Sequence, residues 1–166
     1  KIKHLILVSS TPCFINKKEW NYGVEREIFE KFASQLLVNW KKTMHQFFLL
    51  QLYGVPNIRK VATKFEETIL SAGKPDPKAL TLGLKLLLDT DCRENLININ
   101  VKTLVISGDK DRLTSLASSK YMDNIIPNSS LKVFPGAGHI PFLFEPEIFV
   151  QSILNFVKEK NDRQNI

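Results

Sequence analysis

Two short apolar runs, each followed by glycine and ionisable side chains, most constrain how this chain can fold. Residues 101–107 (VKTLVIS) end at Gly108 and lead into two carboxylates. Residues 130–134 (SLKVF) lead into His139, which lies in a glycine-rich turn. Between the two runs, residues 116–126 have the apolar spacing of one helix. This strand–helix–strand order is typical of a right-handed parallel crossover, so acid and base are predicted to leave neighbouring strand ends.

The remainder of the chain adds one strand and several helices to this unit. Residues 2–8 form a β-branched and leucine-rich run that predicts a buried parallel strand. Residues 24–53 have helical spacing and predict two helices with a bend. Pro56 opens a third helix, Asp76 caps a fourth, and Pro146 begins the last helix of the chain. On the fourth helix, the leucines expected on the inner face are Leu80, Leu84, Leu87 and Leu88.

The ionisable residues after the second and third runs predict acid–base chemistry. His139 is the expected general base, and either Asp109 or Asp111 can hold its imidazole in one tautomer. A serine or cysteine nucleophile needs such partners, but no nucleophile motif is visible in the sequence. His4 and His45 lie within a predicted strand and a predicted helix, so we expect them to be structural or surface residues.

The two cysteines give little sign of a disulfide framework or a metal site. Cys13 and Cys92 are far apart and lack metal-ligand spacing, which favours a reducing cytoplasm. Cys13 is rejected as a nucleophile because no glycines of a nucleophile turn surround it. No apolar run approaches the length of a membrane span, so no membrane partner is expected.

The functional residues resemble those of the α/β-hydrolase family, whose triad follows the chain order nucleophile, acid, histidine. Within this family, the set resembles the pimeloyl-acyl-carrier-protein methyl ester esterases of biotin synthesis. Asp111 matches the acid in the pattern G-x-x-D-x-L, whereas Asp109 then becomes a turn cap. The family often has Val-Pro where this chain has Thr114 and Ser115. Further matching positions are residues 5–14 (LILVSSTPCF), Glu19, Trp20, Phe47, Gln51, Gly54 and residues 138–142 (GHIPF).

The resemblance covers nearly the whole chain but only the later two-thirds of such an enzyme. It implies that residues 1–13 and 99–166 form the carboxyl-terminal part of an α/β-hydrolase core, with residues 14–98 as a helical lid insertion. The nucleophile turn G-x-S-x-G and the oxyanion loop are expected upstream of Lys1. This chain alone would then hold acid and base but be inactive without that segment.

The resemblance also implies a substrate and a partner. Phe47 matches an aromatic that lines the acyl channel, Arg59 keeps an arginine that grips acyl-carrier protein, and Lys42 replaces another. Residues 31–65 contain six Lys and Arg and no Asp or Glu, which accounts for the net charge of +6. An acidic carrier protein fits this charge through electrostatic steering, although a solvated helical face is the simpler interpretation.

These observations predict a cytoplasmic carboxylic ester hydrolase that demethylates pimeloyl-acyl-carrier-protein methyl ester and needs no metal or organic cofactor. A general short-acyl carboxylesterase of the same fold remains an alternative. A noncatalytic basic module that binds an acidic carrier protein is another. Nucleic-acid binding is not expected, because no groove-reading or base-stacking motif accompanies the basic residues.

Overall fold

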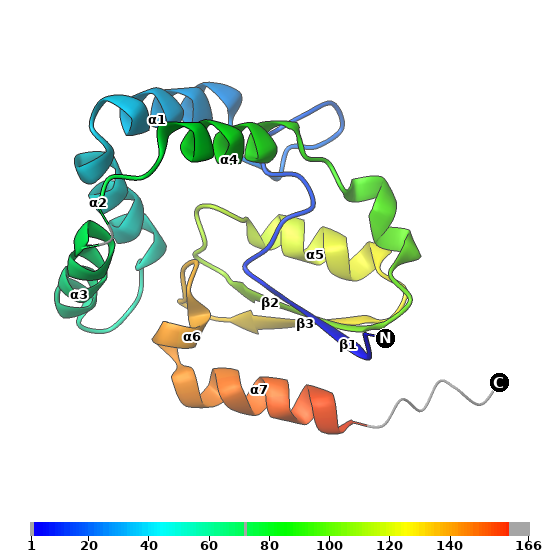
Figure 1. The fold of residues 1–166 in the computed structure, drawn as a ribbon. Coiled ribbons are helices and arrows are strands. Elements are labelled where there is room, and N and C mark those ends of the chain that lie inside the picture. The colour runs from blue at the N-terminus through cyan, green and yellow to red at the C-terminus, as the bar shows by residue number, and fades with distance from the viewer. Residues whose placement is uncertain (1, 72, 160–166) are drawn as a thin grey trace.

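A three-stranded parallel sheet forms the centre of the molecule (Figure 1). The computed structural model describes residues 2–71 and 73–159. The three strands that the sequence predicts are β1 (His4–Val8), β2 (Lys102–Gly108) and β3 (Ser129–Phe134), and they lie in the order β1-β2-β3. Their register pairs Val8 with Ile106, and Gly108 with Phe134. The loops that follow the three strands therefore leave from the same edge of the sheet.

Four α-helices connect β1 to β2, in agreement with the sequence prediction. The predicted bend falls at Asn39, which is not helical and whose side chain accepts a hydrogen bond from the backbone N–H of Lys42. Asp76 caps the fourth helix in the same way through Lys78. A 3₁₀ helix that the sequence did not predict, η1 (Arg93–Asn98), returns the chain to β2. The helices are α1 (Arg26–Val38), α2 (Trp40–Gln51), α3 (Ile58–Ser71) and α4 (Pro77–Asp89).

Helices cover both faces of the sheet. The helix α5 (Leu116–Ile125) lies on one face and α7 (Pro146–Lys158) lies on the other, with the short α6 (Pro141–Phe144) before it (Figure 1). Side chains of a strand alternate between faces, so Val105 packs with Met122 of α5, whereas Ile106 packs in the cluster of Phe156 from α7. Both faces of the strand are thus buried, which explains the unbroken apolar run at the centre of β2, residues 104–106. No helix within the described residues is long and apolar enough to cross a membrane.

The helix α4 departs from the expectation for an amphipathic core helix. None of its residues is buried, and Leu87, expected on the inner face, is 42% exposed. A largely apolar cavity of about 330 Å³ lies between α4 and the loop after β1. The assignment of Leu87 to a packed face is therefore wrong, because its side chain borders this cavity. The described residues that line the cavity are Thr11, Pro12, Phe14, Gly83, Leu86, Leu87 and Thr90.

Gly108, at the end of β2, is predicted to be intolerant of any side chain. A Cβ atom there would collide with the backbone carbonyl oxygens of Ala137 and Gly138. We expect Gly108→Ala to lower the free energy of unfolding by about 3 kcal/mol, measured by urea denaturation, because the backbone must move. The control is Gly83→Ala in α4, where an added Cβ meets nothing and helix propensity favours alanine by about 1 kcal/mol. Equal unfolding midpoints for the two variants would contradict this prediction.

Candidate active site

The loops after β2 and β3 are joined directly through backbone and side-chain hydrogen bonds. The backbone N–H of Lys110 donates to the carbonyl oxygen of Ala137 at 2.9 Å. Asp109 Oδ1 accepts a hydrogen bond from the backbone N–H of Gly136 at 2.7 Å. Asp109 therefore holds the two loops together, which agrees with the alternative of a turn-capping residue and leaves Asp111 free for another partner.

Asp111 and His139 lie in direct contact. Asp111 Oδ2 is 2.9 Å from His139 Nδ1, across the gap between the two loops. The Asp111 side chain has no exposed surface, whereas the imidazole of His139 is 23% exposed. This contact orients the ring and directs Nδ1 inward, so Nε2 is the nitrogen that can exchange a proton with a reactant.

The Asp111 carboxylate accepts further hydrogen bonds from its own loop. Oδ1 accepts from the backbone N–H groups of Leu113 and Thr114, at 2.8 and 3.0 Å. Oδ2 accepts from the Thr114 hydroxyl at 2.7 Å. Burial opposes ionisation, but the hydrogen bond and charge of His139, together with the two backbone donors, outweigh it and hold the pKa of Asp111 below its ordinary value.

The turn between α2 and α3 forms a third side of the site that the sequence did not predict. The backbone N–H of Gly138 donates to the carbonyl oxygen of Tyr53 at 3.1 Å. The guanidinium of Arg112 lies 4.8 Å from the centre of the Tyr53 ring, in cation–π geometry. In the sequence, the glycine at position 54 and the proline at position 56 marked this turn, and the structure gives Gly54 a φ of +86°. The helical insertion is thus attached to both loops of the site.

The loop after β1 does not bring a nucleophile to the pair. Ser9 has a φ of 44°, and its buried hydroxyl has no hydrogen-bond partner among the described residues, His139 included. Burial raises the pKa of the Cys13 thiol, and the charge of Asp91 raises it further. The Cys13 thiol donates to the carbonyl oxygen of Ile15. These contacts agree with the rejection of Cys13 as a nucleophile.

The predicted substrate-binding residues lie on the helical insertion. Phe47 of α2 is half-buried, with its ring 5.2 Å from that of Phe32 on α1. Lys42 of α2 and Arg59 of α3 are exposed. Phe47 is not among the described residues that line the apolar cavity beside α4. The structure therefore places these three residues on helices α2 and α3. Within the described part of the chain, none of them is a hydrogen-bond partner of the Asp111 or His139 side chain.

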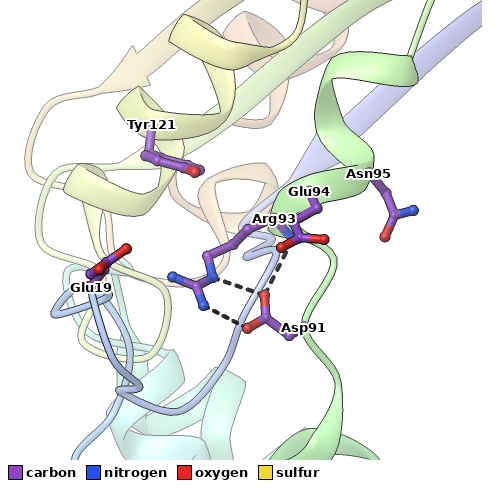
Figure 2. A pocket seen from close by; sticks show the side chains of 6 residues that line it. All are labelled: Glu19, Asp91, Arg93, Glu94, Asn95 and Tyr121. Atoms are coloured by element: carbon purple, nitrogen blue, oxygen red, sulfur yellow. Dashed lines mark hydrogen bonds and ion pairs between the residues drawn. The ribbon is translucent and has the colours of Figure 1, made fainter.

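A second, polar cavity of about 480 Å³ lies where the insertion returns to the core (Figure 2). Arg93 and Asp91 form a two-pronged ion pair at its wall, with both side-chain distances at 2.8 Å. The hydrogen bond from Arg93, acting against partial burial, lowers the pKa of Asp91 to about 2. Arg93 also lies 5.7 Å from the centre of the buried Trp20 ring. The cavity is lined by Glu19, Asp91, Arg93, Glu94, Asn95 and Tyr121.

Metal ligands do not gather in the part of the chain that the structure describes. No group of three or more His, Cys, Asp and Glu side chains is placed there to hold a metal ion.

Comparison with known families identifies the fold. The alpha/beta hydrolase fold family matches residues 1–146. This chain belongs to the α/β-hydrolase family. Among solved structures, an esterase from Exiguobacterium antarcticum superposes with a TM-score of 0.85 at 24% identity, covering 95% of this chain and 57% of that one. A thermophilic esterase superposes with a TM-score of 0.68 at 26% identity, covering 93% and 56% of the two chains. The predicted fold class is therefore confirmed.

Two similar sequences carry the same name. The pimeloyl-[acyl-carrier protein] methyl ester esterase of Nitrosomonas europaea is 33% identical over 150 residues, which is 90% of this chain and 60% of the relative. Its counterpart in Photobacterium profundum is 34% identical over 158 residues, 95% of this chain and 62% of the relative. The chain thus spans about three-fifths of the length of these relatives.

The lowered pKa of Asp111 predicts a pH-dependent contribution to stability. Because the folded pKa lies below the unfolded one, the contribution is complete above the unfolded value of about 3.9 and is lost as pH falls through the folded pKa. We expect Asp111→Asn to cost about 2 kcal/mol at pH 7, since the buried donors lose a charged acceptor. In urea unfolding, the difference from the unsubstituted chain should shrink between pH 5 and pH 2.

The control for this pH dependence is Glu67→Gln, at an exposed position of α3. This variant should show a small difference that changes little over the same range. A difference for Asp111→Asn that is as large at pH 2 as at pH 7 would show that ionisation of Asp111 does not stabilise the fold.

Proposed function

We propose that this chain carries the acid and base of a carboxylic ester hydrolase with a Ser-His-Asp triad. The observation that carries the proposal is the 2.9 Å contact between Asp111 Oδ2 and His139 Nδ1. A buried carboxylate that fixes a partly exposed imidazole is the arrangement that activates a hydroxyl nucleophile. Similar esterases and membership of the α/β-hydrolase family favour ester hydrolysis over other acid–base chemistry.

In the proposed mechanism, Nε2 of His139 takes the proton from a serine hydroxyl as its oxygen bonds to the ester carbonyl carbon. The tetrahedral intermediate then loses the alkoxide, which leaves as an alcohol with the proton from His139. Water, deprotonated by His139, attacks the acyl-serine and releases the carboxylic acid and the serine. Asp111 remains ionised throughout and stabilises the imidazolium that forms in each half-reaction.

We propose that the serine comes from a polypeptide segment other than residues 1–166. The sequence contains no G-x-S-x-G motif. Within the described residues, the outer edge of β1 pairs with no other strand, and the central residues of β1 are Leu5, Ile6 and Leu7. An apolar edge of this kind is a template for another strand. A strand that delivers the nucleophile would fit beside β1, on the side away from β2.

The proposed substrate is pimeloyl-acyl-carrier-protein methyl ester, because the similar esterases are named for this substrate. Residues 14–98 would act as a lid, with Phe47 as part of the wall that contacts the acyl chain. The apolar cavity between α4 and the loop after β1 is also suited to a hydrocarbon chain. A general short-acyl carboxylesterase is the alternative, and comparison of carrier-bound methyl esters with short nitrophenyl esters distinguishes the two.

The proposed partner is an acidic acyl-carrier protein that docks on α2 and α3. Lys42 and Arg59 are exposed on these helices, as are the neighbouring Lys41, Lys60 and Lys64. Exposed cations on adjacent helices attract an acidic surface and raise the rate of encounter. A noncatalytic module that binds the same partner would show docking without ester cleavage. We also propose a cytoplasmic location, with which two unpaired cysteines, Cys13 and Cys92, are compatible.

The catalytic proposal predicts loss of ester turnover when either member of the pair is changed. Residues 1–166 would be assayed alone and after fusion to the part of the Photobacterium profundum esterase that they do not match. We expect no turnover from the chain alone and measurable kcat from the fusion. His139→Ala and Asp111→Asn should each lower kcat of the fusion by about 10³-fold or more, because the serine loses its oriented base.

Asp109→Asn in the same fusion is the matched control, since its predicted role is to join the two loops. It should keep more activity than Asp111→Asn. A fusion that cleaves esters equally well with and without His139 would rule out the proposed triad.

The docking proposal predicts weaker binding when the cations of α2 and α3 are removed. The double substitution Lys42→Ala with Arg59→Ala should weaken binding of acyl-carrier protein about tenfold at low salt, measured by titration calorimetry. The difference in affinity between the double variant and the unsubstituted chain should become smaller at 0.5 M salt, because screening weakens the attraction between opposite charges. Lys120→Ala, at an exposed position of α5, is the control. Equal losses from Lys120→Ala and the double variant would indicate non-specific attraction.

A further inference from the structure

The Asp111 carboxylate has a hydrogen-bond donor that the proposed triad does not require. The Thr114 hydroxyl donates to Asp111 Oδ2 at 2.7 Å, and the same oxygen lies 2.9 Å from His139 Nδ1. Thr114 is only 4% exposed, so the hydroxyl belongs to the interior of the site. Two donors thus meet at the oxygen that orients the imidazole.

These contacts use the full accepting capacity of the carboxylate. An ionised carboxylate offers about four lone-pair positions. Two at Oδ1 receive the backbone N–H groups of Leu113 and Thr114, and two at Oδ2 receive Thr114 and His139. Because the Asp111 side chain has no exposed surface, water cannot replace a donor that is removed. The carboxylate plane is therefore set by four donors.

We infer that Thr114 is a positioning residue for the Asp111–His139 pair, whose hydroxyl holds Oδ2 ionised and directed toward His139 Nδ1. The inference deepens the proposed function. It rests on that proposal for the catalytic role of the Asp111–His139 pair, whereas the positioning itself rests on the hydrogen bonds. The two backbone donors both bind Oδ1, and donors to one oxygen alone restrain rotation of the carboxylate about the Cβ–Cγ bond less than donors to both oxygens. The hydroxyl supplies the restraint at Oδ2 itself.

The proposed role of Thr114 depends on its hydroxyl group and not on the shape of its side chain. Valine has nearly the same volume but no donor, and the backbone N–H of position 114 remains in either case. The loop is held independently by Ser115, whose hydroxyl accepts from the backbone N–H of Ser118 and donates to the carbonyl oxygen of Tyr22. Loss of the Thr114 hydroxyl therefore leaves the other attachments of this loop in place.

His139 contacts Asp111, whereas the other charged groups of the same loop contact other partners. Asp109 of the same loop accepts from Gly136 in the loop after β3, and Lys110 lies 3.9 Å from Asp109. Arg112 lies over the Tyr53 ring of the α2–α3 turn. The first turn of α5, which follows Thr114, consists of uncharged residues. A change in Asp111 titration on substitution of Thr114 thus reports loss of the hydroxyl.

The inference is tested by titrating the Asp111 carboxyl carbon by NMR in the 166-residue chain. Thr114→Val should raise the measured pKa of Asp111 by about 1 unit, because the charged carboxylate loses a stronger hydrogen bond than the neutral carboxyl group does. Thr114→Ser keeps the hydroxyl and should leave the value unchanged. Thr43→Val is the matched control, since Thr43 is equally buried but donates to the backbone of Asn39.

A folded Thr114→Val variant with the Asp111 pKa of the unsubstituted chain would overturn the inference. So would an equal rise in Thr43→Val. A measurement on the unsubstituted chain covers the case in which Thr114→Val does not fold. The Thr114 hydroxyl proton should exchange slowly with water and give a nuclear Overhauser contact to the imidazole of His139, and rapid exchange would overturn the inference. None of these measurements needs ester turnover. If the proposed esterase activity fails, they still show whether Thr114 positions Asp111.

Discussion

The close backbone contact between the loops after β2 and β3 is the constraint on which the site depends. Gly108 ends β2 directly beneath the carbonyl oxygens of Ala137 and Gly138, where a side chain has no room. Lys110 and Asp109 then bond to the facing loop, and only after these contacts does the chain reach Asp111. The distance between the acid and the histidine is therefore set by main-chain packing and not by the flexibility of two side chains.

Two carboxylates of the molecule are kept ionised in different ways. Asp91 is partly exposed and forms a two-pronged ion pair with Arg93, which lowers its pKa to about 2. Asp111 is buried and has no guanidinium partner, and its charged form is stabilised by hydrogen bonds from the imidazole and from neutral donors. An imidazole accepts and releases protons near neutral pH, whereas a guanidinium remains charged. Of the two arrangements, the one at Asp111 is therefore suited to proton transfer, whereas the Arg93–Asp91 pair stays charged.

The helical segment between β1 and β2 is attached to the rest of the molecule at two places and packs loosely between them. It is attached firmly at the site, where Tyr53 bonds to Gly138 and lies beneath Arg112. It is also attached where the backbone N–H of Cys92 donates to the carbonyl oxygen of Pro12, and where the Trp20 ring contacts that of Tyr121 in α5. Between these attachments, α4 buries none of its residues and borders an apolar cavity. Two fixed ends and a loosely packed helix between them are consistent with the proposed role of this segment as a cover over an acyl chain.

The amino-acid sequence alone was enough to predict the three strands, the α-helices between them and the approach of acid to histidine. These features follow from local periodicity, from caps such as Asp76, and from the rule that parallel strands end at one edge of a sheet. It did not predict η1, the exposure of Leu87 or the contact of Tyr53 with the site. The hydrogen bond from the Thr114 hydroxyl to Asp111 became visible only in the folded chain, although the sequence already showed that Thr114 departs from the family pattern. Periodicity reports which face of one element is apolar, whereas a hydrogen-bond partner depends on how distant elements pack and on side-chain rotation.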